Sequence, residues 1–328
     1  MFSSCSPEWR PLQAMKRLPE ALLILCLCWP YLQAASAEEI IRDQRNRELH
    51  LQISEHFGAQ EHEAIREWIR YLSQSLTLVY GHWPRDHWGI EVEPVSGSSS
   101  DPIPWAQVHR EGMDRVVFYV VNNASSETLK LEWTGYHELS HLLLPYRGWG
   151  DTWFSEGLAS YYQNILQARA GIISEQQMWQ NLHDGFKRGR ADNRFDGQPL
   201  LQVNQRMRKN GGYMRVYWSG AWYFLAADIA LREHTNGKQS LDDALANLNN
   251  CCASASMSVA QIIARMDAGS VDHTFSRLYQ QVYQSTRQPD FEPLFAQLGI
   301  TLVADKVVLA ENGPAATRRR QFLTSSAL

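Results

Sequence analysis

The sequence predicts an α+β protein in which a few strands precede a long series of helices. Residues 115–121 are a continuous run of β-branched and aromatic residues bounded by charged and polar ones, which is typical of a buried strand. Residues 90–95 alternate like a strand with one buried face. From 152 to about 298 the apolar residues recur at helical spacing instead. Strands confined to the first half, followed by helices, favour the α+β class.

The composition is that of a folded globular protein. The chain has 328 residues, 44% hydrophobic and 20% charged, with a formal net charge of -4. These values exclude a largely disordered chain. Because the chain is mildly acidic and has no basic block, its charge gives no reason to expect a nucleic-acid partner.

The N-terminal segment has the pattern of a secretory signal. An apolar run over 21–28 follows the basic pair at 16–17, and small residues occupy 35 and 37. This order predicts a signal peptide over 1–37 with cleavage after Ala37, and therefore a periplasmic or secreted protein. An N-terminal membrane anchor is the alternative, although the apolar run is shorter than the roughly 20 residues that a bilayer requires.

The predicted mature chain, 38–328, is nearly free of cysteine. Only the adjacent pair Cys251 and Cys252 remains after cleavage. Neighbouring cysteines close only a strained ring, so we interpret them as two thiols in a loop, with a vicinal disulfide as the alternative. No further run of 18 apolar residues occurs, so no membrane span is expected in the mature chain.

The first half, 38–150, is expected to combine a small sheet with two helices. Apolar residues at helical spacing predict a helix over 59–80, before the strands over 90–95 and 115–121. A second helix is predicted over 129–144, where Pro145 stops it.

The second half, 151–303, is expected to be helical. The predicted breaks are Gly171, the polar stretch 190–212 and the pair at 236–237. The remainder, 304–328, is expected to be a frayed tail, and we interpret the arginines at 318–320 as solvent-exposed.

The most informative motif is His137-Glu138-Leu139-Ser140-His141. On a helix, residues i and i+4 lie on one face about a turn apart, so both imidazoles can reach a single metal ion. Glu138 projects toward the same cleft and can hold a water molecule there. The motif therefore predicts a metal centre with His137 and His141 as ligands.

A third ligand is expected from the helical segment 153–162. Catalytic zinc needs three protein ligands and an open position. Glu156 is a lone carboxylate on an otherwise apolar surface, where packing does not explain it. Asp151 is the alternative ligand, but it is more simply explained as a helix N-cap. Ser160, one turn after Glu156, either supports the site or packs between helices.

The pattern of 137–141 followed by 153–157 resembles that of the gluzincins, in the aminopeptidase N and glycyl aminopeptidase families. The likeness covers roughly 105–303 and is strongest to the glycyl aminopeptidases. It continues at 217–222, 228–232, 237–243 and 291–299. The resemblance implies a zincin-type catalytic domain, with a small sheet and an active-site helix, followed by a mainly helical half that completes the cleft.

The resemblance also implies a mechanism. It implies one Zn²⁺ per chain, held by His137, His141 and Glu156. Peptide bonds would be hydrolysed by a zinc-activated water, with Glu138 as the general base. Tyr217, which precedes an x-x-Gly turn in those families, would donate a hydrogen bond to the oxyanion. Tyr213 is the alternative donor.

The chain departs from the two families in ways that leave its specificity open. Only 14 residues separate His141 from Glu156. The glycine-rich acidic motif that holds a substrate's free amine in those families is not evident, and 112–114 is only a poor counterpart of it. The sequence therefore predicts a metallopeptidase acting on peptides or proteins, as an aminopeptidase or an endopeptidase. The alternative is a non-catalytic zincin-like binding or envelope-assembly protein that retains the metal site.

The remaining histidines and the tryptophan pair receive simpler interpretations. The other histidines of the mature chain, which include His50 and His87, show no ligand spacing, and we interpret them as surface or core residues. Trp218 and Trp222 lie four residues apart and are expected to pack in the core rather than form a substrate platform.

Overall fold

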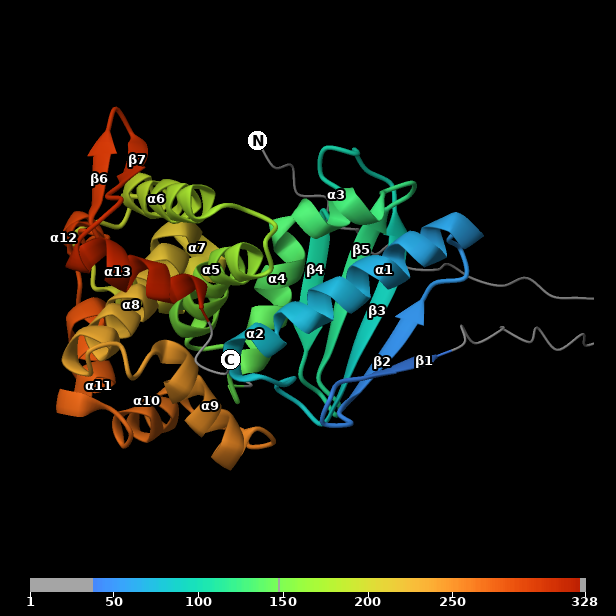
Figure 1. Ribbon diagram of the computed structural model, residues 1–328, viewed down its shortest axis with the longest axis horizontal. Helices are drawn as coiled ribbons and strands as arrows, with labels where there is room; N and C mark the ends of the chain where they lie inside the picture. The colour runs from blue at the N-terminus through green and yellow to red at the C-terminus, as the bar shows by residue number, and fades with distance from the viewer. Residues whose placement is uncertain (1–37, 147, 325–328) are drawn as a thin grey trace, which may run out of the picture. The chain divides into compact units, whose positions relative to one another are not determined.

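The computed structural model describes residues 38–146 and 148–324 (Figure 1). The signal peptide predicted over 1–37 lies outside the described residues. None of the described helices is long and apolar enough to cross a bilayer.

The N-terminal half is built on a mixed sheet of five strands in the order β1-β2-β3-β5-β4. The strands are β1 (Glu39–Arg42), β2 (Glu48–Ile53), β3 (His87–Val95), β4 (Trp105–His109) and β5 (Arg115–Val121). The central pairs β2–β3 and β3–β5 are parallel, whereas β1 and β4 run antiparallel to their neighbours at the two edges. The strand predicted over 115–121 coincides with β5, and the one over 90–95 lies within β3.

Helix α1 (Ala59–Ser75) covers one face of this sheet (Figure 1). Side-chain burial alternates along β2: Leu49 and Leu51 are buried, whereas Glu48 and His50 are only half-buried. Trp68 of α1 meets the ring of Phe118 on β5 at 5.1 Å. The predicted helix over 59–80 is thus confirmed as α1 and the short α2 (Thr77–Tyr80).

The helix predicted over 129–144 is divided in the structure. It is replaced by α3 (Ser126–Leu131), α4 (Trp133–Ser140) and the 3-10 turn η1 (His141–Leu143). Glu132 separates α3 from α4 because it adopts an extended conformation, and its carboxylate accepts a hydrogen bond from the Thr134 hydroxyl at 3.0 Å. The predicted start was therefore wrong, and the motif helix begins at residue 133.

The C-terminal half contains the helices expected from the sequence. They are α5 (Thr152–Arg169), α6 (Glu175–Ala191), α7 (Leu200–Asn210), α8 (Tyr213–His234), α9 (Leu241–Cys252), α10 (Val259–Asp267), η2 (Val271–His273), α11 (Thr274–Tyr283) and α12 (Glu292–Gln297). The polar stretch 190–212, which was predicted to interrupt the helices, contains α7, so that prediction was wrong for 200–210. The helix forms because Leu200, Val203 and Met207 lie on one face and are buried, although most of the other residues of the segment are polar.

Helices α5 and α8 approach each other closely at two glycines. A Cβ on Gly157 would lie 2.4 Å from the Cα of Gly220, and one on Gly220 would lie 1.8 Å from the carbonyl oxygen of Trp153. Only glycine fits at this crossing. Gly220, expected in a turn after Tyr217, instead lies inside α8, where it permits the helix contact.

The C-terminal segment is folded rather than frayed. It forms the hairpin β6 (Ile300–Val303) and β7 (Lys306–Leu309), then α13 (Pro314–Arg320) and η3 (Gln321–Leu323). Strands are therefore not confined to the first half. The side chain of Arg319 is only 3% exposed and donates to Glu175 at 2.8 Å and to the Ala310 carbonyl at 2.8 Å, while Arg318 pairs with Glu233. The solvent-exposed interpretation was therefore wrong for Arg319, which is buried, whereas Arg318 is half-buried and Arg320 is exposed.

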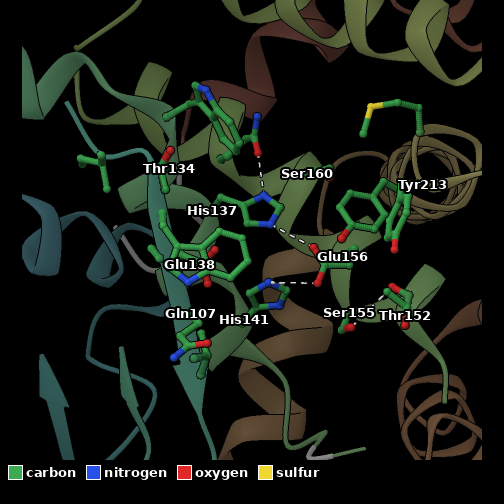
Figure 2. A pocket seen from close by; sticks show the side chains of 18 of the residues that line it. Gln107, Thr134, His137, Glu138, His141, Thr152, Ser155, Glu156, Ser160 and Tyr213 are labelled. Carbon is green, nitrogen blue, oxygen red and sulfur yellow. Dashed lines mark hydrogen bonds and ion pairs between the residues drawn. The ribbon is translucent and has the colours of Figure 1, made fainter. Parts of the chain in front are cut away.

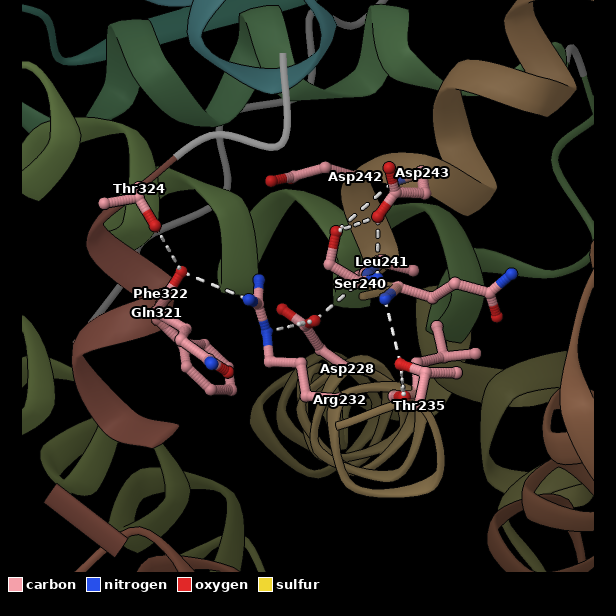
Figure 3. Close-up of polar contacts among 12 residues, drawn as sticks. Asp228, Arg232, Thr235, Ser240, Leu241, Asp242, Asp243, Gln321, Phe322 and Thr324 are labelled. Carbon is pink, nitrogen blue, oxygen red and sulfur yellow. Dashed lines mark hydrogen bonds and ion pairs between the residues drawn. The ribbon is translucent and has the colours of Figure 1, made fainter. Parts of the chain in front are cut away.

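Buried charges join this segment to the helical half (Figure 3). Asp228 of α8 accepts hydrogen bonds from Arg232 at 2.9 Å, from the Leu241 amide at 3.0 Å and from the Tyr161 hydroxyl at 2.8 Å. Arg232 in turn donates to the carbonyl of Gln321 at 3.1 Å. The pair Asp228–Arg232 lies within α8, and its partners Tyr161, Leu241 and Gln321 belong to α5, α9 and η3, so the network fixes these three elements around α8.

Cys251 and Cys252 form a disulfide, so the interpretation as two free thiols was wrong. They are the last two residues of α9, where Cys251 is exposed and Cys252 is half-buried. At this helix end little packing holds the two side chains apart, and their sulfur atoms meet.

Candidate metal centre

The two histidines of the motif meet Glu156 in a cleft of about 1240 Å³ (Figure 2). His137 lies on α4 and His141 begins η1, one turn later, and Glu156 projects from α5. The Nε2 atom of His137 lies 3.1 Å from Oε2 of Glu156, and Nε2 of His141 lies 3.7 Å from its Oε1. One ligand atom from each residue lies within 4.8 Å of the others.

These residues fit a zinc ion. Two imidazole nitrogens and one carboxylate oxygen are the ligands of many catalytic zinc sites, with one position left open. The Nδ1 atom of His137 lies 2.8 Å from Oε1 of Gln163, which directs Nε2 toward Glu156. Such outer hydrogen bonds fix the tautomer and orientation of a ligating histidine. The Tyr217 hydroxyl lies near the Glu156 carboxylate and helps to lower its pKa.

The electrostatics of the three residues suit a cation. Burial opposes the charged form of His137, but the hydrogen bond and charge of Glu156 outweigh it and raise the pKa of His137 to about 9. Burial lowers the pKa of His141 to about 4. Burial would raise the pKa of Glu156, yet the two histidines hold it below its usual value. At neutral pH the centre therefore carries an ionised Glu156 carboxylate, a protonated His137 and a neutral His141, and a zinc ion would take the place of the His137 proton beside Glu156.

Glu138 has a different environment from Glu156, although both border the cleft. Burial, with a smaller contribution from the charge of Glu156, raises the pKa of Glu138 to about 7 despite the opposing charge of His137. A carboxyl group with a pKa near the working pH both accepts and returns a proton efficiently.

The end of the motif helix is held by a buried ion pair cluster. Asp114 accepts from Arg85 at 2.8 Å and from Arg110 at 2.7 Å. Arg110 also donates to the carbonyl of His141, and Arg85 donates to that of Leu144 at 3.0 Å. Asp114, in the segment 112–114, is therefore buried between two arginines and anchors the end of the helix.

Asp151 and Ser160, the other two residues proposed for the site, differ in their positions. Asp151 occupies the N-cap position of α5, as predicted, although its side chain makes no capping hydrogen bond. Asp151 is not part of the group of possible metal ligands formed by His137, His141 and Glu156. Ser160 is buried and borders the cleft, but the residue that contacts His137 is Gln163. Gln163 was not predicted from the sequence. Its spacing could have indicated it, because it follows Glu156 by two helical turns and so lies on the same face of α5.

Both candidate tyrosines reach the cleft. Tyr217 is half-buried beside Glu156, whereas Tyr213, the first residue of α8, is 40% exposed. Their rings meet edge to face with centroids 6.3 Å apart. The cleft thus offers one phenol in contact with the ligand group and a second one nearer to the solvent.

Aromatic residues and an edge strand form the outer part of the cleft. Trp105, Trp133 and Trp149 border it and are 60%, 50% and 73% exposed. Trp105 begins β4, whose outer edge pairs with no other described strand. Trp218 also borders the cleft but is 4% exposed, and Trp222 is 5% exposed, in agreement with core packing. An extended chain with apolar side chains would find complementary surface along this edge.

Comparison with known families supports the sequence resemblance. The family model described as M61 glycyl aminopeptidase matches residues 149–221, the segment that contains Glu156 and Tyr217. No significant match was found among curated proteins.

The fold is similar to several solved structures. An aminopeptidase N family protein from Idiomarina loihiensis matches with a TM-score of 0.60 and 16% identity, over 81% of this chain and 49% of the other. An M1 zinc metallopeptidase from Deinococcus radiodurans matches with a TM-score of 0.51 and 16% identity, over 77% and 52%. A variant of that peptidase bound to a Tyr-Ser-Ala substrate gives a TM-score of 0.50 at 16% identity, over 77% and 52%. The chain thus spans about half the length of these structures.

These comparisons confirm two of the sequence predictions. The predicted α+β fold is confirmed, since it is similar to the folds of these structures. The resemblance to the glycyl aminopeptidases is confirmed by the family model. Together with the buried histidines and Glu156, they support a zinc peptidase hydrolase.

Replacing Gln163 tests the outer hydrogen bond. We expect Gln163→Ala to weaken zinc binding by about 10- to 100-fold, because His137 loses the group that orients its ring. Competition with a fluorescent zinc chelator measures the change. Gln167→Ala is the matched control, since this buried glutamine lies one turn further along α5 and donates to Leu131 instead. Equal zinc affinity in the two variants would contradict the assignment.

Proposed function

We propose that this chain is a zinc-dependent metallopeptidase that hydrolyses peptide bonds in the cleft between β4 and α8. The observation that carries the proposal is the convergence of His137, His141 and Glu156 beside the buried carboxyl group of Glu138. A purely structural metal site would need neither Glu138 nor an open approach from the solvent. One zinc ion per chain is expected at this centre.

The residues of the chain have distinct tasks in this reaction. Zinc, when bound, supplies a Lewis acid that polarises a peptide carbonyl and acidifies a water molecule. Glu138 accepts the proton of the attacking water and delivers it to the leaving amine. Tyr217 stabilises the developing oxyanion by donating its hydroxyl proton in a hydrogen bond. The hydroxyl of Tyr217 helps to lower the pKa of Glu156, and both residues line the cleft, so Tyr217 lies beside the centre.

The substrate is a peptide or protein segment in extended conformation. The free edge of β4 and the exposed rings of Trp105 and Trp133 offer backbone and apolar contacts along the cleft. The M1 relative bound to Tyr-Ser-Ala takes a short peptide. Because Asp114 is buried in a structural cluster, it does not select a free amine, and both exopeptidase and endopeptidase activity fit the cleft.

Replacement of the general base tests the proposal. Glu138→Gln is expected to retain zinc and to lower kcat by about 10² to 10⁴, because the amide cannot take the proton. A peptide-library digest followed by mass spectrometry, with and without chelator, measures the activity and shows whether cleavage occurs internally or at the N-terminus. Glu127→Gln is the control, since its exposed carboxylate lies on α3 and pairs only with Lys130 among the described ion pairs.

The same digest separates the two tyrosines and the two functions. Tyr217→Phe is expected to lower kcat by about 10² to 10³, whereas Tyr213→Phe keeps most of the activity.

A zinc-loaded wild type that cleaves no peptide would contradict the peptidase proposal. That result would favour the alternative of a zincin-like binding or envelope-assembly protein.

We also propose that the protein is exported, to the periplasm or the medium. The signal pattern of 1–37 supports this, and the disulfide between Cys251 and Cys252 suits an oxidising compartment. Mass spectrometry of the exported protein is expected to find Glu38 as its first residue. An intact N-terminus recovered with the membrane fraction would indicate the anchor instead.

A further inference from the structure

A second cluster of metal-ligating side chains lies on the sheet, outside the cleft. Glu48, His50 and His87 each offer one ligand atom within 4.8 Å of the other two. Strands β2 and β3 bring them together, because Glu48 lies level with His87 in the parallel pairing and His50 follows two residues later on the same face. This face is opposite to the one that Leu49 and Leu51 bury against α1.

The carboxylate of Glu48 is oriented toward both histidines. Its Oε1 accepts a hydrogen bond from Arg42 at 2.6 Å. Its Oε2 lies 3.3 Å from Nδ1 of His87 and 3.7 Å from Nε2 of His50. Arg42 therefore holds one oxygen and leaves the other directed at the two imidazoles.

His50 is oriented by a second carboxylate. Its Nδ1 lies 3.1 Å from Oε1 of Glu38, which leaves Nε2 as the nitrogen that faces Glu48 and His87. A carboxylate on the outer nitrogen is the usual arrangement behind a metal-bound histidine. The rings of His50 and His87 lie with their centroids 6.3 Å apart.

We propose that Glu48, His50 and His87 form a second transition-metal site. Two imidazoles with one carboxylate suit borderline ions such as Zn²⁺, Ni²⁺ and Cu²⁺, and three protein ligands leave a position for water. The site is more open than the centre in the cleft, since the side chain of His87 is 63% exposed. Its metal is therefore expected to bind more weakly and to exchange more readily.

The consequence of binding is structural rather than catalytic. The ion would join β2 to β3 directly, and Glu38 would tie the beginning of β1 to the same point. Strand β1 is an edge strand of four residues, and among the described strands it pairs with β2 alone. A metal ion that binds only the folded sheet raises the stability of the protein in proportion to its occupancy. This proposal does not depend on peptidase activity.

Calorimetric titration with Zn²⁺ tests the site. The full protein is loaded with one zinc equivalent, dialysed at pH 8 and then titrated. We expect one further equivalent to bind and to raise the unfolding temperature. The double variant His50→Ala/His87→Ala is expected to lose this equivalent and the temperature shift while retaining the first zinc and peptide hydrolysis.

Two control variants make the result specific. His56→Ala removes an exposed histidine outside the cluster and is expected to bind the second equivalent unchanged. His141→Ala is expected to lose the first zinc and to keep the second. The proposal is overturned if the zinc-loaded wild type binds no further equivalent. It is also overturned if the double variant still binds one, which would assign the binding to other surface groups.

Discussion

The contact of α5 with α8 at Gly157 and Gly220 is the constraint on which the centre depends. Glu156 directly precedes the first glycine, and Tyr217 lies three residues before the second. Because neither glycine has room for a side chain, the two backbones touch at this crossing. The close approach brings Tyr217 beside Glu156, and both residues line the cleft. It also sets how far Glu156 extends toward His137 on α4 and His141 on η1.

The histidines need an equally firm support, which their own helix does not supply. An isolated helix of eight residues is unstable in water, so tertiary contacts must fix α4. Glu132 begins the helix, and the cluster of Arg85, Arg110 and Asp114 holds the carbonyls at its end. Gln163 then sets the ring of His137 from α5. The charges buried for these contacts are paired, which avoids the large cost of an isolated buried ion.

The parts that could be predicted from the sequence are those that depend on neighbours in the chain. His137 and His141 follow from helical spacing alone, and β5 follows from its continuous apolar run. Glu156 stood out because a lone carboxylate on an apolar helix lacks a packing role. In contrast, α7 was hidden by its polar composition, since only three buried apolar residues define its inner face.

Contacts between distant segments could not be predicted in the same way. His50 and His87 share a face only because the register of β2 against β3 places them there, and no local spacing reveals that register. Likewise, Arg319 is buried because Glu175 and a row of carbonyls lie opposite to it. The pairing of Cys251 with Cys252 depends on side-chain orientation at the end of α9.

The most direct test of the central claim is anomalous diffraction from crystals of the zinc-bound protein, on both sides of the zinc absorption edge. We expect an anomalous peak in the cleft, about 2.0–2.2 Å from Nε2 of His137, Nε2 of His141 and the Glu156 carboxylate. A cleft without a peak, or a zinc ion there held by other side chains, would contradict the account.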